Sequence, residues 1–223
     1  MTRVALFGLP ASGKGTLAKK MQEQWGWEPL STGDMIRRMR SEQTPIGERL
    51  RGLPPGTFAD DALVLAAVKV ELENPKYAKG VIFDGFPRTL AQLDAMESVG
   101  VELDAVLYLE ADEDELVTRA ENRRVHIPSG RVYNNKSAKP KQEGLDDLTG
   151  EPLTWREDDH EDVARRRFAD YWLKTHPVVE TLKTRSEAGL IRFIAVDGRG
   201  DSRRAWEDAE KFLAMSVRSR LGR

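Results

Sequence analysis

The sequence contains no cysteine, which excludes disulfide bonds and thiolate metal sites and predicts a reducing compartment. It also lacks any apolar run that approaches the roughly 20 residues of a membrane-spanning helix. The short apolar stretch near the N-terminus has no signal-peptide cleavage site behind it. These absences predict a cytoplasmic protein without a membrane partner.

An excess of charge of either sign is missing as well. Lysine and arginine number 35, aspartate and glutamate number 37, and the formal net charge is -2. Since proteins that bind nucleic acid usually present a basic surface, we expect no nucleic-acid partner. With 39% hydrophobic residues, the 223 residues can build one domain with insertions.

Short apolar runs alternate with helical patterns along the chain. Strands are expected at residues 3–9, 28–31, 81–83, 105–109 and 191–196. Helices are expected at residues 15–25, 34–40, 61–73, 90–99, 113–122, 162–186 and 202–217. This alternation predicts an α/β fold, in which a five-stranded parallel sheet has helices on both faces and binds ligands beyond the carboxyl ends of its strands.

Two segments interrupt this alternation, residues 41–60 and 125–158. Because long structureless loops are rare in compact domains, both are expected to fold as small excursions over the ligand cleft. In the second segment, regularly placed side chains predict a small apolar core. They are Val132, Tyr133, Leu145, Leu148 and Trp155.

Residues 8–16, Gly-Leu-Pro-Ala-Ser-Gly-Lys-Gly-Thr, lie between the first expected strand and the first expected helix. Gly8 and Gly13 let the backbone curl so that successive N–H groups point at one oxyanion, and the helix N-terminus adds positive partial charge. Lys14 supplies a point charge for terminal phosphates. We interpret this stretch as a phosphate-binding loop. In the general motif a serine or threonine directly follows the lysine. Here Gly15 follows Lys14, and the hydroxyl group comes one residue later, at Thr16.

Several motifs, in the same order along the chain, resemble those of the adenylate kinase family in its long-lid form. They are the loop at residues 8–16, Ser31-Thr32-Gly33-Asp34-Met35-Ile36-Arg37, Phe83-Asp84-Gly85-Phe86-Pro87-Arg88-Thr89, Arg123-Arg124-Val125-His126, Ser129-Gly130-Arg131-Val132-Tyr133 and residues 146–153. The resemblance extends from Arg3 to about residue 198. It implies a P-loop NTPase-like fold with a core at residues 1–30, 61–121 and 160–223, an AMP-binding segment at 31–60 and a lid at 122–159.

The resemblance also implies an activity, the reversible, magnesium-dependent transfer of a phosphoryl group from ATP to AMP to give two ADP, by a monomer. The residues that it implies for ATP are Ala11, Ser12, Gly13, Lys14, Gly15, Thr16, Arg119, Arg123, Val132, Tyr133 and Gly200. Those for AMP are Thr32, Arg37, Thr57, Phe58, Ala59, Gly85, Phe86, Pro87, Arg88, Gln92, Arg156 and Arg167. The implied catalytic residues are Lys14, Arg88, Arg123, Arg156 and Arg167, and the implied magnesium residues are Asp84 and Asp34, acting through water.

The residue types support this assignment independently. Phosphoryl transfer between two nucleotides depends on positioning and charge, and ATP and AMP bring about -4 and -2 against about +2 from magnesium. Lys14 and the five arginines 37, 88, 123, 156 and 167 would supply about +6. Within the run 165–167, Arg167 is four residues from both Val163 and Tyr171, which predicts that it lies on the apolar face while Arg165 lies in solvent.

Four lid residues have the spacing of a four-cysteine zinc ribbon, His126 and Ser129 followed after sixteen residues by Asp146 and Thr149. Neutral hydroxyls are poor zinc ligands, so we predict a hydrogen-bonded polar cluster and no zinc.

Three alternatives stay open. Asn134 stands where many relatives have a donor-contacting histidine, and relatives that use GTP also carry asparagine there, so the donor could be GTP or the acceptor another nucleotide. The phosphate loop alone would also fit a non-catalytic adenine-nucleotide sensor. Finally, Thr89 and Gln92 fit a helix capping box, which alone could explain Gln92 without a contact to the AMP base.

Overall fold

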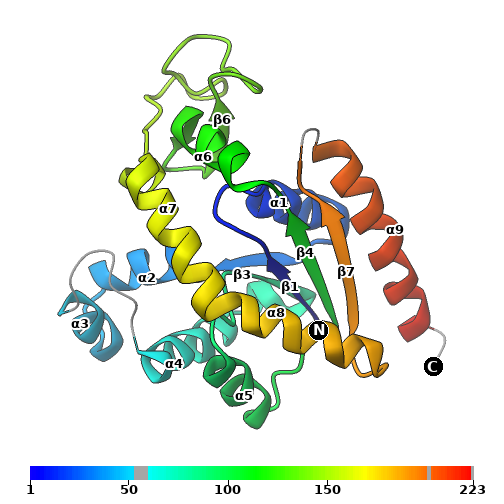
Figure 1. Ribbon diagram of the computed structural model, residues 1–223. Helices are drawn as coiled ribbons and strands as arrows, with labels where there is room; N and C mark the ends of the chain where they lie inside the picture. Colours follow the sequence, from blue (N-terminus) through cyan, green and yellow to red (C-terminus); the bar gives the residue numbers. More distant parts are fainter. Residues whose placement is uncertain (53–59, 200–201, 222–223) are drawn as a thin grey trace.

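The computed structural model describes residues 1–52, 60–199 and 202–221. Its centre is a parallel sheet in the order β2-β3-β1-β4-β7 (Figure 1). The bounds are Thr2–Phe7 for β1, Glu28–Ser31 for β2, Gly80–Asp84 for β3, Ala105–Glu110 for β4 and Arg192–Asp197 for β7. Within the described residues the sheet has five strands, all parallel, which confirms the predicted fold class.

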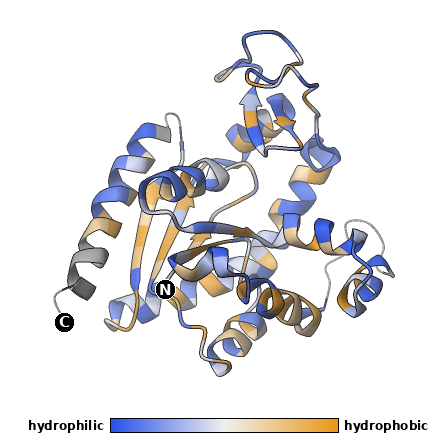
Figure 2. Ribbon diagram, turned by 180° about the vertical axis from the view of Figure 1, so that it is seen from behind, coloured by the Kyte–Doolittle hydropathy of each residue, from blue (hydrophilic) through white to orange (hydrophobic). Residues whose placement is uncertain are grey.

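Helices cover both faces of the sheet. They are α1 at Lys14–Trp25, α2 at Thr32–Ser41, α3 at Pro45–Arg51, α4 at Asp61–Leu72, α5 at Leu90–Ser98, α6 at Glu113–Asn122, α7 at Glu161–Asp170, α8 at His176–Glu187 and α9 at Ser202–Leu221. Alternate residues of β1 point to opposite faces. Val4 and Leu6 pack with α1 and α9, whereas Ala5 and Phe7 pack in the cluster that contains α4, α5 and α8. Figure 2 shows the apolar strands of the sheet lying among helices that carry both polar and apolar residues.

One long helix was expected at residues 162–186, and that prediction is wrong in its middle. The structure has α7, a π-helical turn at Tyr171–Thr175 and then α8. Pro177, in the first turn of α8, has no N–H to donate to the preceding turn, so α-helical hydrogen bonding cannot run through unbroken. The wider turn carries the chain across this point, because the N–H of His176 bonds to the carbonyl of Tyr171.

The described part of the first excursion, residues 41–52, and the lid segment both stand away from the sheet (Figure 1). Residues 41–52 contain α3, which was not expected; Thr44 caps it by accepting a hydrogen bond from the Gly47 N–H at 3.0 Å. The lid segment, residues 122–159, contains the antiparallel pair β5, Arg123–His126, and β6, Arg131–Asn134.

The predicted apolar core of the lid segment is wrong for most of its members. Val132, Leu148 and Trp155 are 53%, 76% and 38% exposed, and only Tyr133 of the five predicted side chains is buried. The lid is too thin to bury large side chains from two layers, and polar contacts hold it together instead.

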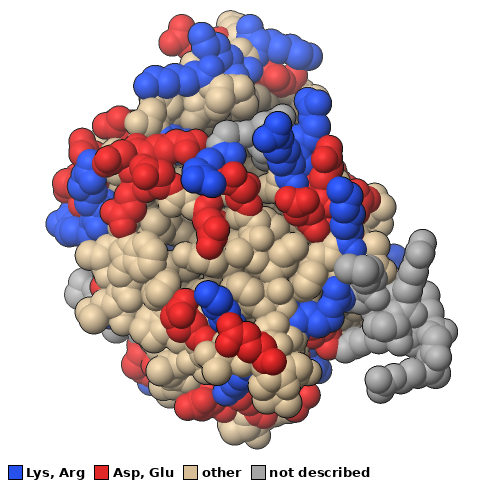
Figure 3. All heavy atoms as spheres, turned by 45° about the vertical axis from the view of Figure 1, so that its right-hand side comes forward, with Lys and Arg blue, Asp and Glu red and all other residues tan. Residues whose placement is uncertain are grey.

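No helix among the described residues has the length and apolarity to cross a membrane. Figure 3 shows positive and negative side chains interspersed over the face that it draws, as expected from the near-equal numbers of acidic and basic residues.

Candidate active site

The phosphate-binding loop connects β1 to α1 at the carboxyl edge of the sheet. Gly8 and Gly13 have φ of +138° and +100°, values that side-chain-bearing residues rarely adopt. A Cβ on Gly8 would also lie 2.7 Å from the carbonyl oxygen of Leu109, so no other residue fits there. The loop therefore directs the N-terminus of α1 toward the space above the sheet.

Ala11 is the one described residue other than glycine with a positive φ, at +66°. A Cβ in this left-handed region costs roughly 1–2 kcal/mol. The loop of this chain therefore retains its shape at some cost in backbone strain.

Lys14 folds back over the loop. Its Nζ donates hydrogen bonds to the carbonyl oxygens of Gly8 at 2.8 Å and Leu9 at 2.9 Å. Burial lowers the pKa of Lys14 to about 8, the nearby charge of Asp84 opposes this shift, and nearby arginines lower the pKa further. A bound anion would therefore stabilise the charged form of Lys14 and oppose this shift.

A cleft of about 1020 Å³ opens above the carboxyl edge of the sheet. Its wall contains most of the residues predicted to contact ATP, AMP or magnesium. They are Ala11, Gly13, Lys14, Gly15, Thr16, Asp34, Arg37, Asp84, Gly85, Pro87, Arg88, Arg119, Arg123, Val132, Tyr133, Arg156 and Arg167. Residues far apart in sequence therefore reach one cavity.

The cleft concentrates positive charge in a partly dehydrated space. Burial lowers the pKa values of Arg88, Arg156 and Arg167, and a nearby arginine lowers each further. Like charges held this close repel one another, so the arrangement favours a polyanionic ligand. Arg165 instead is half-exposed and pairs with Glu161 at 2.8 Å, as its position in the run 165–167 predicted.

Two acidic residues for which no role was predicted contact the arginines of the cleft. Asp159 is 1% exposed and accepts hydrogen bonds from both Nε and Nη2 of Arg123, the first at 2.8 Å. Asp158 forms an ion pair with Arg167 at 3.5 Å. The acidic run 157–159, placed between predicted phosphate-binding arginines, was the available signal for this role.

The two predicted magnesium carboxylates differ in their surroundings. Asp84 ends β3, in register with Leu6 of β1, and faces the cleft near Lys14. Asp34 lies on α2 and accepts a hydrogen bond from Arg37. Burial opposes the ionisation of Asp34, but contacts with Arg37 outweigh it and lower its pKa. Both are oxygen donors of the kind that magnesium reaches through its waters, so the residues present fit this ion.

Other predicted residues are buried. Thr32 is buried and its hydroxyl donates to the carbonyl of Gly85 at 2.8 Å, while Phe86 is 1% exposed in the apolar core. Ser12 and Gln92 are also buried. Their contacts with nucleotides stay predictions. Thr57, Phe58, Ala59 and Gly200 lie outside the described residues.

Arg119 lines the cleft. Its Nη1 donates to the carbonyl of Gly198 at 2.7 Å, and Glu115 pairs with it one helical turn away. Asn134 is engaged as well, because its Oδ1 accepts hydrogen bonds from the N–H groups of Lys136 at 2.9 Å and Ser137 at 3.0 Å.

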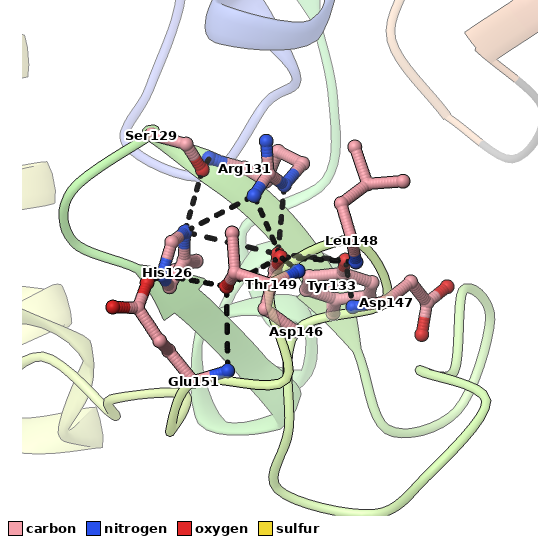
Figure 4. Close-up of polar contacts among 9 residues, drawn as sticks. All are labelled: His126, Ser129, Arg131, Tyr133, Asp146, Asp147, Leu148, Thr149 and Glu151. Atoms are coloured by element: carbon pink, nitrogen blue, oxygen red, sulfur yellow. Dashed lines mark hydrogen bonds and ion pairs between the residues drawn. The ribbon is translucent and has the colours of Figure 1, made fainter.

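The four lid residues with zinc-ribbon spacing form the predicted hydrogen-bonded cluster (Figure 4). Nδ1 of His126 lies 2.7 Å from Oγ of Ser129, and the Thr149 hydroxyl donates to Asp146 at 3.1 Å. Glu151, which was not predicted, lies 2.6 Å from Nε2 of His126.

Asp146 is the centre of this lid cluster (Figure 4). It accepts hydrogen bonds from Arg131 at 2.7 and 2.6 Å and from the Tyr133 hydroxyl at 2.9 Å. The Arg131 hydrogen bonds, with further donors from the Thr149 backbone and Tyr133, hold the pKa of Asp146 well below its usual range. A fully bonded polar network supplies the cohesion that the lid's few apolar side chains do not.

The chain is similar to known adenylate kinases over most of its length. A sequence model of the family described as adenylate kinase matches residues 6–187. The chain is 42% identical to the adenylate kinase of Sodalis glossinidius over 197 residues, which cover 88% of this chain and 92% of that relative. It is 38% identical to the adenylate kinase of Photorhabdus laumondii over 212 residues, which cover 95% and 99% of the two chains.

Proposed function

This chain belongs to the adenylate kinase family, and from that premise we propose that it catalyses ATP + AMP = 2 ADP. The observation that carries the proposal is the convergence of a phosphate-binding loop, Lys14 and six arginines on one cleft. A sensor of nucleotides needs affinity alone, whereas transfer also requires cations around the moving phosphoryl group.

In the reaction, an oxygen of the AMP phosphate attacks the terminal phosphorus of ATP, and the bond from that phosphorus to the bridging oxygen of ADP breaks. The loop N–H groups and Lys14 hold the donor phosphates, and Arg119 lies beside the donor base. Arg37 and Arg88 hold the AMP phosphate. These roles are supported by the fact that Lys14, Arg37, Arg88 and Arg119 all line one cleft together with the loop.

Arg123, Arg156 and Arg167 stabilise the charge that spreads over the transferring group. Asp159 supports this role for Arg123, because a two-point carboxylate contact fixes the plane of the guanidinium group. Magnesium, bound with the nucleotide, neutralises phosphate charge; Asp84 and Asp34 would orient its water shell. We expect no zinc in the lid.

Closure of the two excursions completes the site. Water competes with AMP as acceptor, so the cleft must exclude water before transfer. We propose that the lid, residues 122–159, and the AMP-binding segment, residues 31–60, move onto the core formed by 1–30, 61–121 and 160–223. A bisubstrate inhibitor should then shorten the distance between labels at residues 137 and 52. An unchanged distance with the inhibitor bound would refute closure, even if the activity is observed.

GTP remains the alternative donor, since Asn134 stands at the histidine position of many relatives. The hydrogen bonds that Asn134 makes within its own turn leave its amide oxygen engaged, which favours a structural role. We further propose that the protein acts as a cytoplasmic monomer, without nucleic-acid or membrane partners.

A grid of donors and acceptors tests the activity. ATP and GTP are each combined with AMP, GMP, CMP and UMP, and diphosphate formation is measured with and without magnesium. ATP with AMP should be fastest. The Lys14→Met variant should remain folded and lose on the order of 100-fold or more in rate. Nucleotide binding without any transfer would instead identify a sensor.

A further inference from the structure

The side-chain amide of Gln92 is held at both of its ends by partners of fixed chemistry. Oε1 accepts a hydrogen bond from the backbone N–H of Arg88 at 2.7 Å, and Nε2 donates to Oδ1 of Asp61 at 2.8 Å. A backbone N–H can only donate and a carboxylate oxygen accepts, so the two amide ends cannot be exchanged without losing both bonds. Gln92 is 4% exposed, so hydrogen bonds to water contribute little to the orientation of its amide.

Asp61 is itself fixed by a second bond. Its Oδ2 accepts a hydrogen bond from the Thr89 hydroxyl at 2.9 Å, and Thr89 Oγ1 accepts one from the Gln92 N–H at 3.0 Å. Asp61, at the start of α4, is thereby linked to both the backbone and the side chain of Gln92 on α5. The capping box of Thr89 and Gln92 is only half formed. The Thr89 hydroxyl accepts from the Gln92 N–H, but the Gln92 side chain bonds to Arg88 and Asp61 rather than to the backbone N–H of Thr89.

These bonds leave the Gln92 amide one N–H and one acceptor lone pair. Gln92 itself lies next to the cleft wall, since its hydrogen-bond partner Arg88 lines the cleft. Adenine offers an amino donor beside a ring-nitrogen acceptor and matches such a pair; guanine has a carbonyl acceptor where adenine has the amino group. If the Gln92 amide were turned by 180°, its N–H and lone pair would exchange places, and the preference for adenine over guanine would be reversed.

We propose that Asp61 is a specificity-determining positioning residue, which sets the donor–acceptor order of Gln92 and thereby favours adenine over guanine in the acceptor nucleotide. This inference rests on the proposed function, because it requires Gln92 to contact the base of the acceptor. Asp61 itself touches no substrate; it acts through Gln92.

The test compares AMP and GMP as acceptors at fixed ATP, in wild type, Asp61→Asn and the control Asp94→Asn. Asparagine has the shape of aspartate but can present an N–H to Gln92, which removes one of the two constraints on the amide. The ratio of kcat/KM for AMP to that for GMP should fall about tenfold in Asp61→Asn, mainly through KM for AMP. Asp94 is exposed on α5, and its variant should keep the wild-type ratio.

The outcomes separate the two proposals. If wild type transfers to neither acceptor, the proposed function fails. If wild type prefers AMP and Asp61→Asn keeps the full preference, the inference about Asp61 is overturned. An equal loss toward both acceptors would also overturn it, because that is the effect of a purely structural residue. Thermal unfolding, measured in parallel, shows whether the variant is folded, and Asp61→Ala provides a second removal of the acceptor oxygen.

Discussion

Nucleotide binding should take up protons at alkaline pH, because burial lowers the pKa of Lys14 to about 8. The free protein then holds a partly neutral lysine above pH 8. A bound polyphosphate favours the charged form and raises the pKa toward or beyond its ordinary value. Binding therefore draws a proton from solution, and affinity should decline as the pH rises above 8.

The size of the effect follows from the titration of one group. With a pKa near 8, the neutral fraction is about 0.1 at pH 7, about 0.5 at pH 8 and about 0.9 at pH 9, and proton uptake should follow these values. The nucleotide contributes little above pH 8, because its last phosphate ionisation is near pH 6.

Titration calorimetry in two buffers of different ionisation enthalpy measures this uptake directly. Lys14→Met should lose it, whereas Lys19→Met, an exposed lysine on the same helix, should keep it. Proton uptake near zero at pH 9, or equal uptake in Lys14→Met, would refute the assignment of a partly buried, partly neutral lysine at position 14.

Further predictions concern the metal, the loop and the lid. Asp84→Ala should shift the magnesium titration more than AMP binding, and an unaltered titration would contradict its role. Ala11→Val should lower the free energy of unfolding by about 2 kcal/mol, because a β-branched residue tolerates positive φ poorly, and an equally stable variant would show that φ is not positive there. Asp159→Asn should lower the free energy of unfolding by about 3 kcal/mol and slow phosphoryl transfer, because Arg123 then lacks its carboxylate partner. Wild-type values for both the free energy of unfolding and the rate would contradict this role of Asp159. Elemental analysis should find no stoichiometric zinc, and a zinc ion lost together with stability on chelation would disprove the zinc-free lid.

The sequence determined the features whose signals are local. Apolar runs marked the five strands to within about two residues, since a buried parallel strand needs apolar side chains on both faces. The loop at 8–16 was identified by glycines and a lysine at fixed spacing, and Arg167 was separated from Arg165 by helical phase. The resemblance to adenylate kinases added the roles of residues whose local pattern was ambiguous.

The tertiary structure decided what depends on distant partners. The strand order produces no periodic pattern in the sequence, and neither do the contacts of Arg123 with Asp159 and of Gln92 with Asp61. Each of these contacts joins segments at least 31 residues apart. The lid shows the same limit. Its apolar spacing predicted a core, but burial requires a second layer of chain, which this thin segment lacks, so the polar network around Asp146 holds it together.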